Sequence, residues 1–155
     1  MRLPEGRAEL GPPALKLAGF ELWVHGREFP DATEEWDEDW LHVTAYCAAL
    51  GARVWVSGPI LGSTSLARWM AECEALHATL TGEAELHSYE PNVRVRIEAT
   101  GKSGALAIAV FITPDELSQE HRFEFSIDQS YLPQLVDELR TILAKYHVPV
   151  GLRGA

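Results

Sequence analysis

The sequence predicts an α+β domain with a mostly antiparallel, twisted sheet of about six or seven strands and two helices packed on one of its faces. Two observations support this fold class. Several short segments alternate apolar and polar residues, which favours an antiparallel sheet covered on one face over a doubly wound parallel sheet. Only two stretches have apolar residues at helical spacing. The 155 residues fit one domain, 1–155.

The N-terminal part is predicted to be a lead-in followed by a bent strand. Residues 1–13 are rich in proline and glycine, which predicts a loose lead-in. Leu15 to Val24 alternates in two halves that meet at Gly19, which predicts one strand with a bend or bulge at the glycine. Gly26 to Glu38 is predicted to be a charged loop.

A central hairpin is predicted next. Trp40 to Ala49 alternates, with Leu41, Val43, Ala45 and Cys47 on one side. Gly51 permits a tight turn, and Arg53 to Val56 returns as the partner strand until the chain breaks at Ser57-Gly58-Pro59.

The first predicted helix follows this break. Ser63-Thr64-Ser65 offers hydroxyl groups for its N-cap, and apolar residues recur at helical spacing from Leu66 to Leu80. Gly82 is predicted to end the helix in a left-handed conformation.

The C-terminal half repeats the alternating pattern and ends in a second helix. The helix is expected to begin after a cap at Ser130, to present its apolar face as far as Tyr146 and to stop before Pro149. Residues 150–155 are expected to be a tail. The predicted strands of this half are Glu83–Tyr89, Val93–Glu98, Ala105–Ile112 and Arg122–Ile127.

Composition restricts the classes of partner. The net charge of -10 argues against binding to nucleic acid or to an anionic membrane, because both require lysine and arginine to meet phosphates. The sequence contains no apolar run long enough for a membrane span and no signal core after Met1, so we expect a cytoplasmic protein. Cys47 and Cys73 are predicted to be two buried apolar side chains and not a disulfide framework.

No motif for catalysis or metal binding emerges from the residues. The six histidines form no His-Glu-x-x-His pattern and the cysteines form no Cys-x-x-Cys pair. Gly101-Lys102-Ser103 lacks the upstream glycine of a phosphate-binding loop, and no Gly-x-Ser-x-Gly element is present. We therefore predict a protein that is not an enzyme and has no cofactor and no metal.

The unusual feature of the sequence is an acidic loop before the central strand. Between Asp31 and Asp39 it contains six acids and no lysine or arginine. Aromatic residues surrounded by charge are a common composition of protein–protein hot spots, and charge of a single sign accelerates encounter with a basic partner. The loop lacks the spacing of a calcium-binding EF-hand. The predicted partner-binding residues are Asp31, Glu34, Glu35, Trp36, Asp37, Glu38, Asp39 and Trp40. The alternative is that this segment is only a solvated connection.

Several short segments, in order, resemble the WapI family of immunity proteins, small cytoplasmic partners of contact-dependent polymorphic toxins. The resemblance covers residues 15–149 and implies a non-catalytic protein that occludes a cognate toxin domain. The segments are Leu15–Glu21, Asp39–Val43, Leu66–Trp69, Glu90–Val93 and Phe125–Ile127 with the following Leu135-Val136.

Three alternatives stay open at this stage. One is a domain that binds a small molecule or has a regulatory role, with a pocket between helices and sheet. Another is a hydrolase whose histidine and carboxylate side chains converge in a cleft, because the members of a catalytic triad need not be neighbours in the sequence. The third concerns assembly, because an exposed apolar strip along Trp23 or Trp55 would indicate a homodimer.

Overall fold

The strands form two separate antiparallel sheets. The computed structural model describes residues 7–154. The first sheet has the order β1 (Leu15–Leu17), β2 (Phe20–Arg27), β3 (Trp40–Ala49) and β4 (Ala52–Gly62). The second has the order β5 (Glu83–His87), β6 (Val93–Ala99), β7 (Ala105–Ile112) and β8 (Arg122–Asp128). The α+β class and the antiparallel pairing are confirmed, but the single sheet of six or seven strands is wrong. Alternation identifies a strand and does not say which strands share a sheet.

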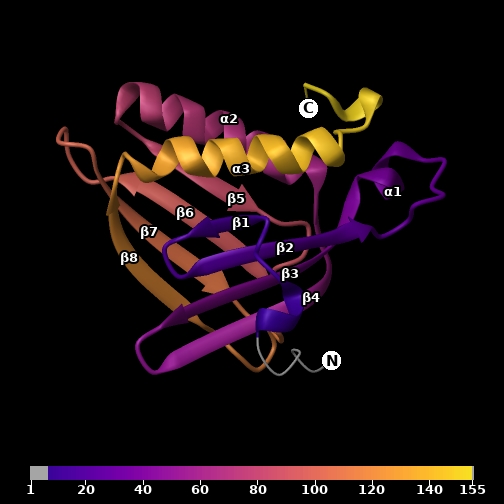
Figure 1. Ribbon diagram of the computed structural model, residues 1–155, viewed down its shortest axis with the longest axis horizontal. Helices are drawn as coiled ribbons and strands as arrows, with labels where there is room; N and C mark the ends of the chain where they lie inside the picture. The colour runs from indigo at the N-terminus through magenta and orange to yellow at the C-terminus, as the bar shows by residue number, and fades with distance from the viewer. Residues whose placement is uncertain (1–6, 155) are drawn as a thin grey trace.

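Two long helices lie side by side across one end of the two sheets (Figure 1). The first, α2 (Ser63–Thr79), packs on β5, and the second, α3 (Tyr131–Lys145), packs on β1. Each helix follows one four-stranded meander, so the topology repeats although the sequence shows no internal repeat. Three short helices complete the described chain: α1 (Glu35–Asp39), η1 (Arg7–Leu10) and η2 (Val150–Leu152). Within residues 7–154, none of the helices has the length and apolar character needed to cross a membrane.

The core lies between the two sheets and under the helices. Leu41, Val43, Ala45 and Cys47 are fully buried, as the alternation of this strand predicts. Facing side chains of β6 and β7 complete the other wall of the core. The buried side chains of the long helices are Leu66, Trp69, Cys73 and Leu76 in α2 and Leu132, Leu135, Val136, Leu139 and Ile142 in α3.

The predicted bulge at Gly19 is instead a tight hairpin turn. β1 and β2 pair with each other, with Leu17 opposite Phe20, so the chain reverses at Ala18-Gly19. A Cβ atom at Gly19 would collide with the carbonyl oxygen of Ala48 and with the ring of Phe125. Glycine is therefore required here because β3 of the same sheet and β8 of the other sheet both approach the turn closely, and not because a bulge forms.

The predicted chain break at Ser57-Gly58-Pro59 is also wrong, since β4 continues through these residues to Gly62. β4 is an outer strand of its sheet, so Pro59, which has no N–H group, is tolerated because its nitrogen points away from β3. A register shift between Leu41 and His42 absorbs the local irregularity.

The boundaries of α2 differ from the predicted ones by a few residues. The N-cap is Gly62, one residue before the predicted serine and threonine hydroxyls. At the other end Leu80 itself takes the left-handed conformation, with φ of 55°, and the predicted terminator Gly82 follows with φ of 84°. Sequence identified the helix correctly because its apolar spacing is strong, whereas its ends depend on tertiary contacts.

The described part of the N-terminal lead-in packs on the outer face of the first sheet. The Gly11 carbonyl accepts a hydrogen bond of 3.1 Å from the indole Nε1 of Trp23, and Ala14 N donates to Leu22 O. Trp23 is consequently buried and offers no apolar strip for dimerisation. Residues 1–6 of the predicted loose lead-in lie outside the described part of the chain.

Both thiols are buried and unpaired, as predicted. Burial raises the pKa of Cys47 to about 12 and that of Cys73, next to Glu72 and Glu74, also to about 12. Because the thiolate is the reactive form, we expect neither cysteine to react with Ellman's reagent at mildly alkaline pH in the folded protein. Two equivalents should react in denaturant. Rapid labelling of the folded protein would contradict the buried placement.

Candidate partner-binding surface

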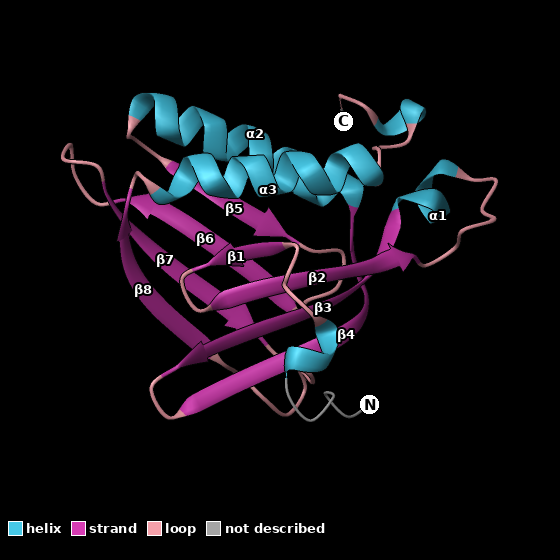
Figure 2. Cartoon of the chain, viewed as in Figure 1, coloured by secondary structure: helices cyan, strands magenta, loops and turns pink. Residues whose placement is uncertain are grey.

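The acidic loop forms a compact lobe at the end of the β2–β3 hairpin (Figure 2). We call residues 28–38 the acidic lobe. Its neck is closed by a hydrogen bond of 3.0 Å from Glu28 N to Trp40 O. The whole lobe is predicted to be a loop, but its last residues belong to α1, whose backbone bond from Glu38 N to Glu34 O measures 2.9 Å. Carboxylates in the first turn favour such a short helix through its dipole.

Asp39 lies at the base of the lobe and is completely buried. Its Oδ1 accepts a hydrogen bond of 3.0 Å from Thr64 N in the first turn of α2, and its Oδ2 accepts one from the hydroxyl of Tyr89. A Cβ atom at Gly62 would collide with this carboxylate, so glycine leaves the space for it. Asp39 therefore anchors the lobe to both halves of the fold and does not present its charge to a partner.

The same contacts perturb Tyr89. Burial, followed by the hydrogen bond to Asp39 and the charge of that carboxylate, raises the pKa of Tyr89 to about 12. The phenol therefore keeps its proton at neutral pH and donates its hydrogen bond to Asp39. The resemblance includes Glu90–Val93, but no pattern in the sequence indicates the contact of Tyr89, just before this segment, with Asp39.

Arg27 holds the lobe from a second direction. Its guanidinium donates hydrogen bonds of 2.6 Å to Glu38 O, at the end of α1, and of 2.6 Å to His147 O, after α3. A cation at two helix C-termini is favourable, because the exposed carbonyl groups carry partial negative charge.

The C-terminal segment is a third attachment. Gly151 N donates a hydrogen bond of 2.7 Å to Oε1 of Glu35, and Leu152 is buried. The predicted tail thus includes the turn η2, which packs on α1. No local pattern in the sequence indicates this contact between residues so far apart.

The two tryptophans of the predicted site have different environments. Trp36 on α1 has 62% of its surface exposed, and Phe29 in the same lobe has 48% exposed. Trp40 is half-buried at the base of the lobe, with its ring centroid 4.7 Å from that of Tyr89. Trp36 is therefore the aromatic residue that the lobe presents to solvent, whereas Trp40 supports it.

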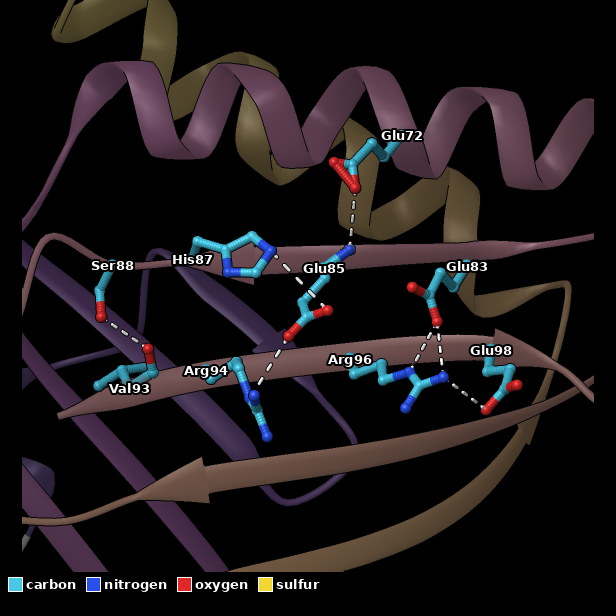
Figure 3. Close-up of polar contacts among 9 residues, drawn as sticks. All are labelled: Glu72, Glu83, Glu85, His87, Ser88, Val93, Arg94, Arg96 and Glu98. Atoms are coloured by element: carbon cyan, nitrogen blue, oxygen red, sulfur yellow. Dashed lines mark hydrogen bonds and ion pairs between the residues drawn. The ribbon is translucent and has the colours of Figure 1, made fainter. Parts of the chain in front are cut away.

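The lobe has the strongest uncompensated charge among the features described. Within residues 7–154, no ion pair involves its five exposed acids, which are Asp31, Glu34, Glu35, Asp37 and Glu38. The outer face of the second sheet is different, because Arg96 lies 2.7 Å from Glu83 and 3.4 Å from Glu98, and Arg94 lies 3.4 Å from Glu85 (Figure 3). Charges on that sheet compensate one another, so the negative field is concentrated at the lobe.

A histidine network lies beside the lobe on the outer face of the first sheet. Nε2 of His25 is 2.7 Å from Oγ1 of Thr44, and Nδ1 of His42 is 2.9 Å from Oε2 of Glu28. Burial, and then the neighbouring His42, lower the pKa of His25. No group of three histidine, cysteine or acidic side chains in the described part of the chain has metal-binding geometry.

Cavities give little support to the small-molecule alternative, which places a pocket between helices and sheet. A depression of about 470 Å³ lies at the loop of residues 113–121, and one of about 510 Å³ separates this loop from β4. A third, of about 310 Å³, lies between the outer surfaces of α2 and α3. All three are surface hollows.

Comparison with known proteins identifies one family. The model of the Immunity protein WapI-like family matches residues 15–147. Searching curated proteins gives no match. One similar solved structure is described as the plant transcriptional regulator PBF-2, with 11% identity and a TM-score of 0.47, covering 85% of this chain and 76% of that one. Another is WHY3 from Arabidopsis thaliana, with 12% identity and a TM-score of 0.45, covering 89% and 87%. Scores this low carry no argument about fold or function.

Proposed function

The chain belongs to the WapI-like immunity protein family, and we propose that it neutralises a cognate toxin domain by binding and occluding it. The family match over residues 15–147 is the observation that carries this proposal. Immunity proteins of this kind are generally non-catalytic, so we assign no reaction to the chain.

We propose that the acidic lobe is the surface that meets the toxin. Its exposed carboxylates have no cationic partner among the described residues, and the exposed Trp36 lies between them in the sequence. Unpaired charge of one sign steers a basic partner, with association rates raised by roughly 10–10³-fold. An aromatic side chain at the centre of such a surface is suited to bury itself in the partner. Asp39 and Trp40 support this surface from below.

The attachment of the lobe favours recognition by a preformed surface. Asp39, Arg27 and Glu35 tie the lobe to α2, to the end of α3 and to η2, respectively. A surface held at three points loses little conformational freedom when it binds, and this increases affinity.

Co-expression in bacteria tests the function itself. The toxin domain encoded next to this protein should stop growth when expressed alone, and growth should resume when the two are expressed together. The two chains should then co-elute as a complex of defined stoichiometry. Continued growth arrest with both proteins folded and present would overturn the proposal.

The contribution of the lobe has a separate test. In the variant Glu34→Gln, Asp37→Asn, Glu38→Gln, the association rate with the toxin domain should fall about tenfold or more, because steering by the lobe is lost. The salt dependence of the rate should flatten as well. Stopped-flow fluorescence at several ionic strengths measures both. Asp39 is left unchanged, because its carboxylate is structural.

A matched control separates the local effect from the change in total charge. Glu74→Gln, Glu116→Gln, Glu120→Gln alters the net charge equally at exposed positions outside the lobe. This variant should retain most of the association rate. Equal losses in the two variants would remove the lobe from the interface and leave the function itself to the growth experiment.

A further inference from the structure

The outer strand β4 presents free backbone groups along one edge of the first sheet. β3 and β4 are joined by the two-residue turn Leu50-Gly51, with Ala49 opposite Ala52. This pair closes the hairpin with mutual hydrogen bonds, and such pairs alternate along an antiparallel ladder. The N–H and C=O groups of Arg53 and Trp55 therefore point away from β3. Within residues 7–154, no backbone bond to another segment involves them.

The position of Pro59 agrees with this alternation. Pro59 lies opposite His42 in the register, at a position where the nitrogen points outward and no ladder bond is lost. The free edge thus runs from the turn at Gly51 to Pro59, and Trp55 lies midway between them.

The other outer strands are protected. The outward N–H of Lys16 in β1 donates to Oε2 of Glu138, and that of Glu85 in β5 donates to Oε1 of Glu72, both at 3.1 Å (Figure 3 shows the second bond). β8 alternates charged side chains such as Arg122 and Glu124, which discourage strand pairing. In β4 no side chain bonds to the outward N–H groups of Arg53 and Trp55 among the hydrogen bonds of the described residues, and the strand has one charged residue, Arg53, and a proline only toward its far end.

A hollow follows this edge. Five consecutive residues of β4, from Arg53 to Ser57, line the depression of about 510 Å³, and Pro114, Gln119 and His121 form its other wall. Side chains of a strand alternate between the two faces of the sheet, so a hollow on one face contacts every second residue. A hollow that contacts consecutive residues lies along the edge of the strand. The hollow therefore leaves the edge of β4 open to an added strand.

The charge of the edge favours a second copy as the occupant. β4 contains Arg53 and no acid, whereas the protein as a whole has a net charge of -10. The basic partner proposed for the acidic lobe would be repelled here. Two copies of this chain can approach at β4 with no carboxylate of one strand opposing a carboxylate of the other.

We propose that two copies of the chain pair through antiparallel β4 edges and form one continuous sheet across a twofold axis. The free segment between Gly51 and Pro59 sets the register of this pairing, because Trp55 lies at its centre. Trp55 faces the same residue of the second copy, and Arg53 faces the position of Ser57. Such an isologous contact is self-complementary, and the turn and Pro59 limit it at both ends. The acidic lobe lies at the opposite end of the hairpin from the turn, so pairing leaves it available to the toxin.

Sedimentation and amide exchange test the pairing in the full chain. The mass should rise from monomer to dimer with concentration. Amide exchange at Arg53 and Trp55 should slow over the same range, while the inward amides of Val54 and Val56 stay protected throughout. Trp55→Lys, which places two ammonium groups opposite each other, should weaken the dimer at least about tenfold. Arg53→Pro should do the same, because it removes an outward donor without removing a ladder bond.

Two control variants separate the dimer from the proposed function. Trp36→Lys, in the acidic lobe, should leave the dimer intact, and Trp55→Lys should leave growth rescue by the protein intact. Failure of the dimer proposal can therefore be distinguished from failure of the proposed function. A monomer at every concentration would overturn the pairing. So would a dimer that persists in both edge variants. Protection of the Arg53 and Trp55 amides only after addition of the toxin domain would overturn it too, and would assign the edge to a strand of the toxin.

Discussion

Replacing Asp39 with alanine is expected to lower the free energy of unfolding by about 2–4 kcal/mol, because three stabilising features are lost together. Thr64 N loses its acceptor at the start of α2, the Tyr89 hydroxyl loses its buried acceptor, and a cavity remains beside Gly62. Each buried polar group left without a partner costs about 1–3 kcal/mol. Urea denaturation followed by fluorescence and circular dichroism measures the change.

The neighbouring acid is the matched control. Asp37→Ala removes an exposed carboxylate from the same short helix and should change stability by less than about 0.5 kcal/mol. Combining Asp39→Ala with Tyr89→Phe should cost less than the sum of the single changes, because the two side chains share one hydrogen bond. Equal stabilities of the two alanine variants would mean that Asp39 does not anchor the lobe.

Asp39 also shows where sequence reasoning stops. Alternation and helical spacing depend on a residue's near neighbours, and they predicted most strands and both long helices. The role of Asp39 depends on Thr64 and Tyr89, which are remote in the sequence. Its five acidic neighbours in the segment are exposed, so local composition assigned all six to the surface.

The division into two sheets was unpredictable for a similar reason. Alternation shows that β4 and β5 are strands, but α2 separates them and they do not pair. The sequence indicates a special role for Gly19. A glycine is needed there because a Cβ atom would collide with the Ala48 carbonyl in β3 and with the Phe125 ring in β8 of the other sheet. The contacts of Arg27 and Gly151 could not be predicted from local patterns either, because each residue bonds to a segment that is remote in the sequence.

The second large effect is expected from Trp36→Ala. If the acidic lobe docks on the toxin, loss of this indole should weaken the complex by about 2 kcal/mol or more, roughly thirtyfold in dissociation constant. The loss should appear mainly as faster dissociation, since the charges that steer the encounter are unchanged. Stability should change little, because the ring is 62% exposed. Surface plasmon resonance with immobilised toxin domain separates the two rates.

Leu117→Ala is the control, because Leu117 is 92% exposed and lies on the loop of residues 113–121, outside the acidic lobe. Its removal should leave both rates unchanged. The comparison with the charge variant of the lobe is then decisive. Loss of the carboxylates should slow association, and loss of the indole should accelerate dissociation. If Trp36→Ala binds as tightly as the unaltered protein while the charge variant still associates slowly, the lobe attracts the toxin, but the docking contacts lie elsewhere on the fold.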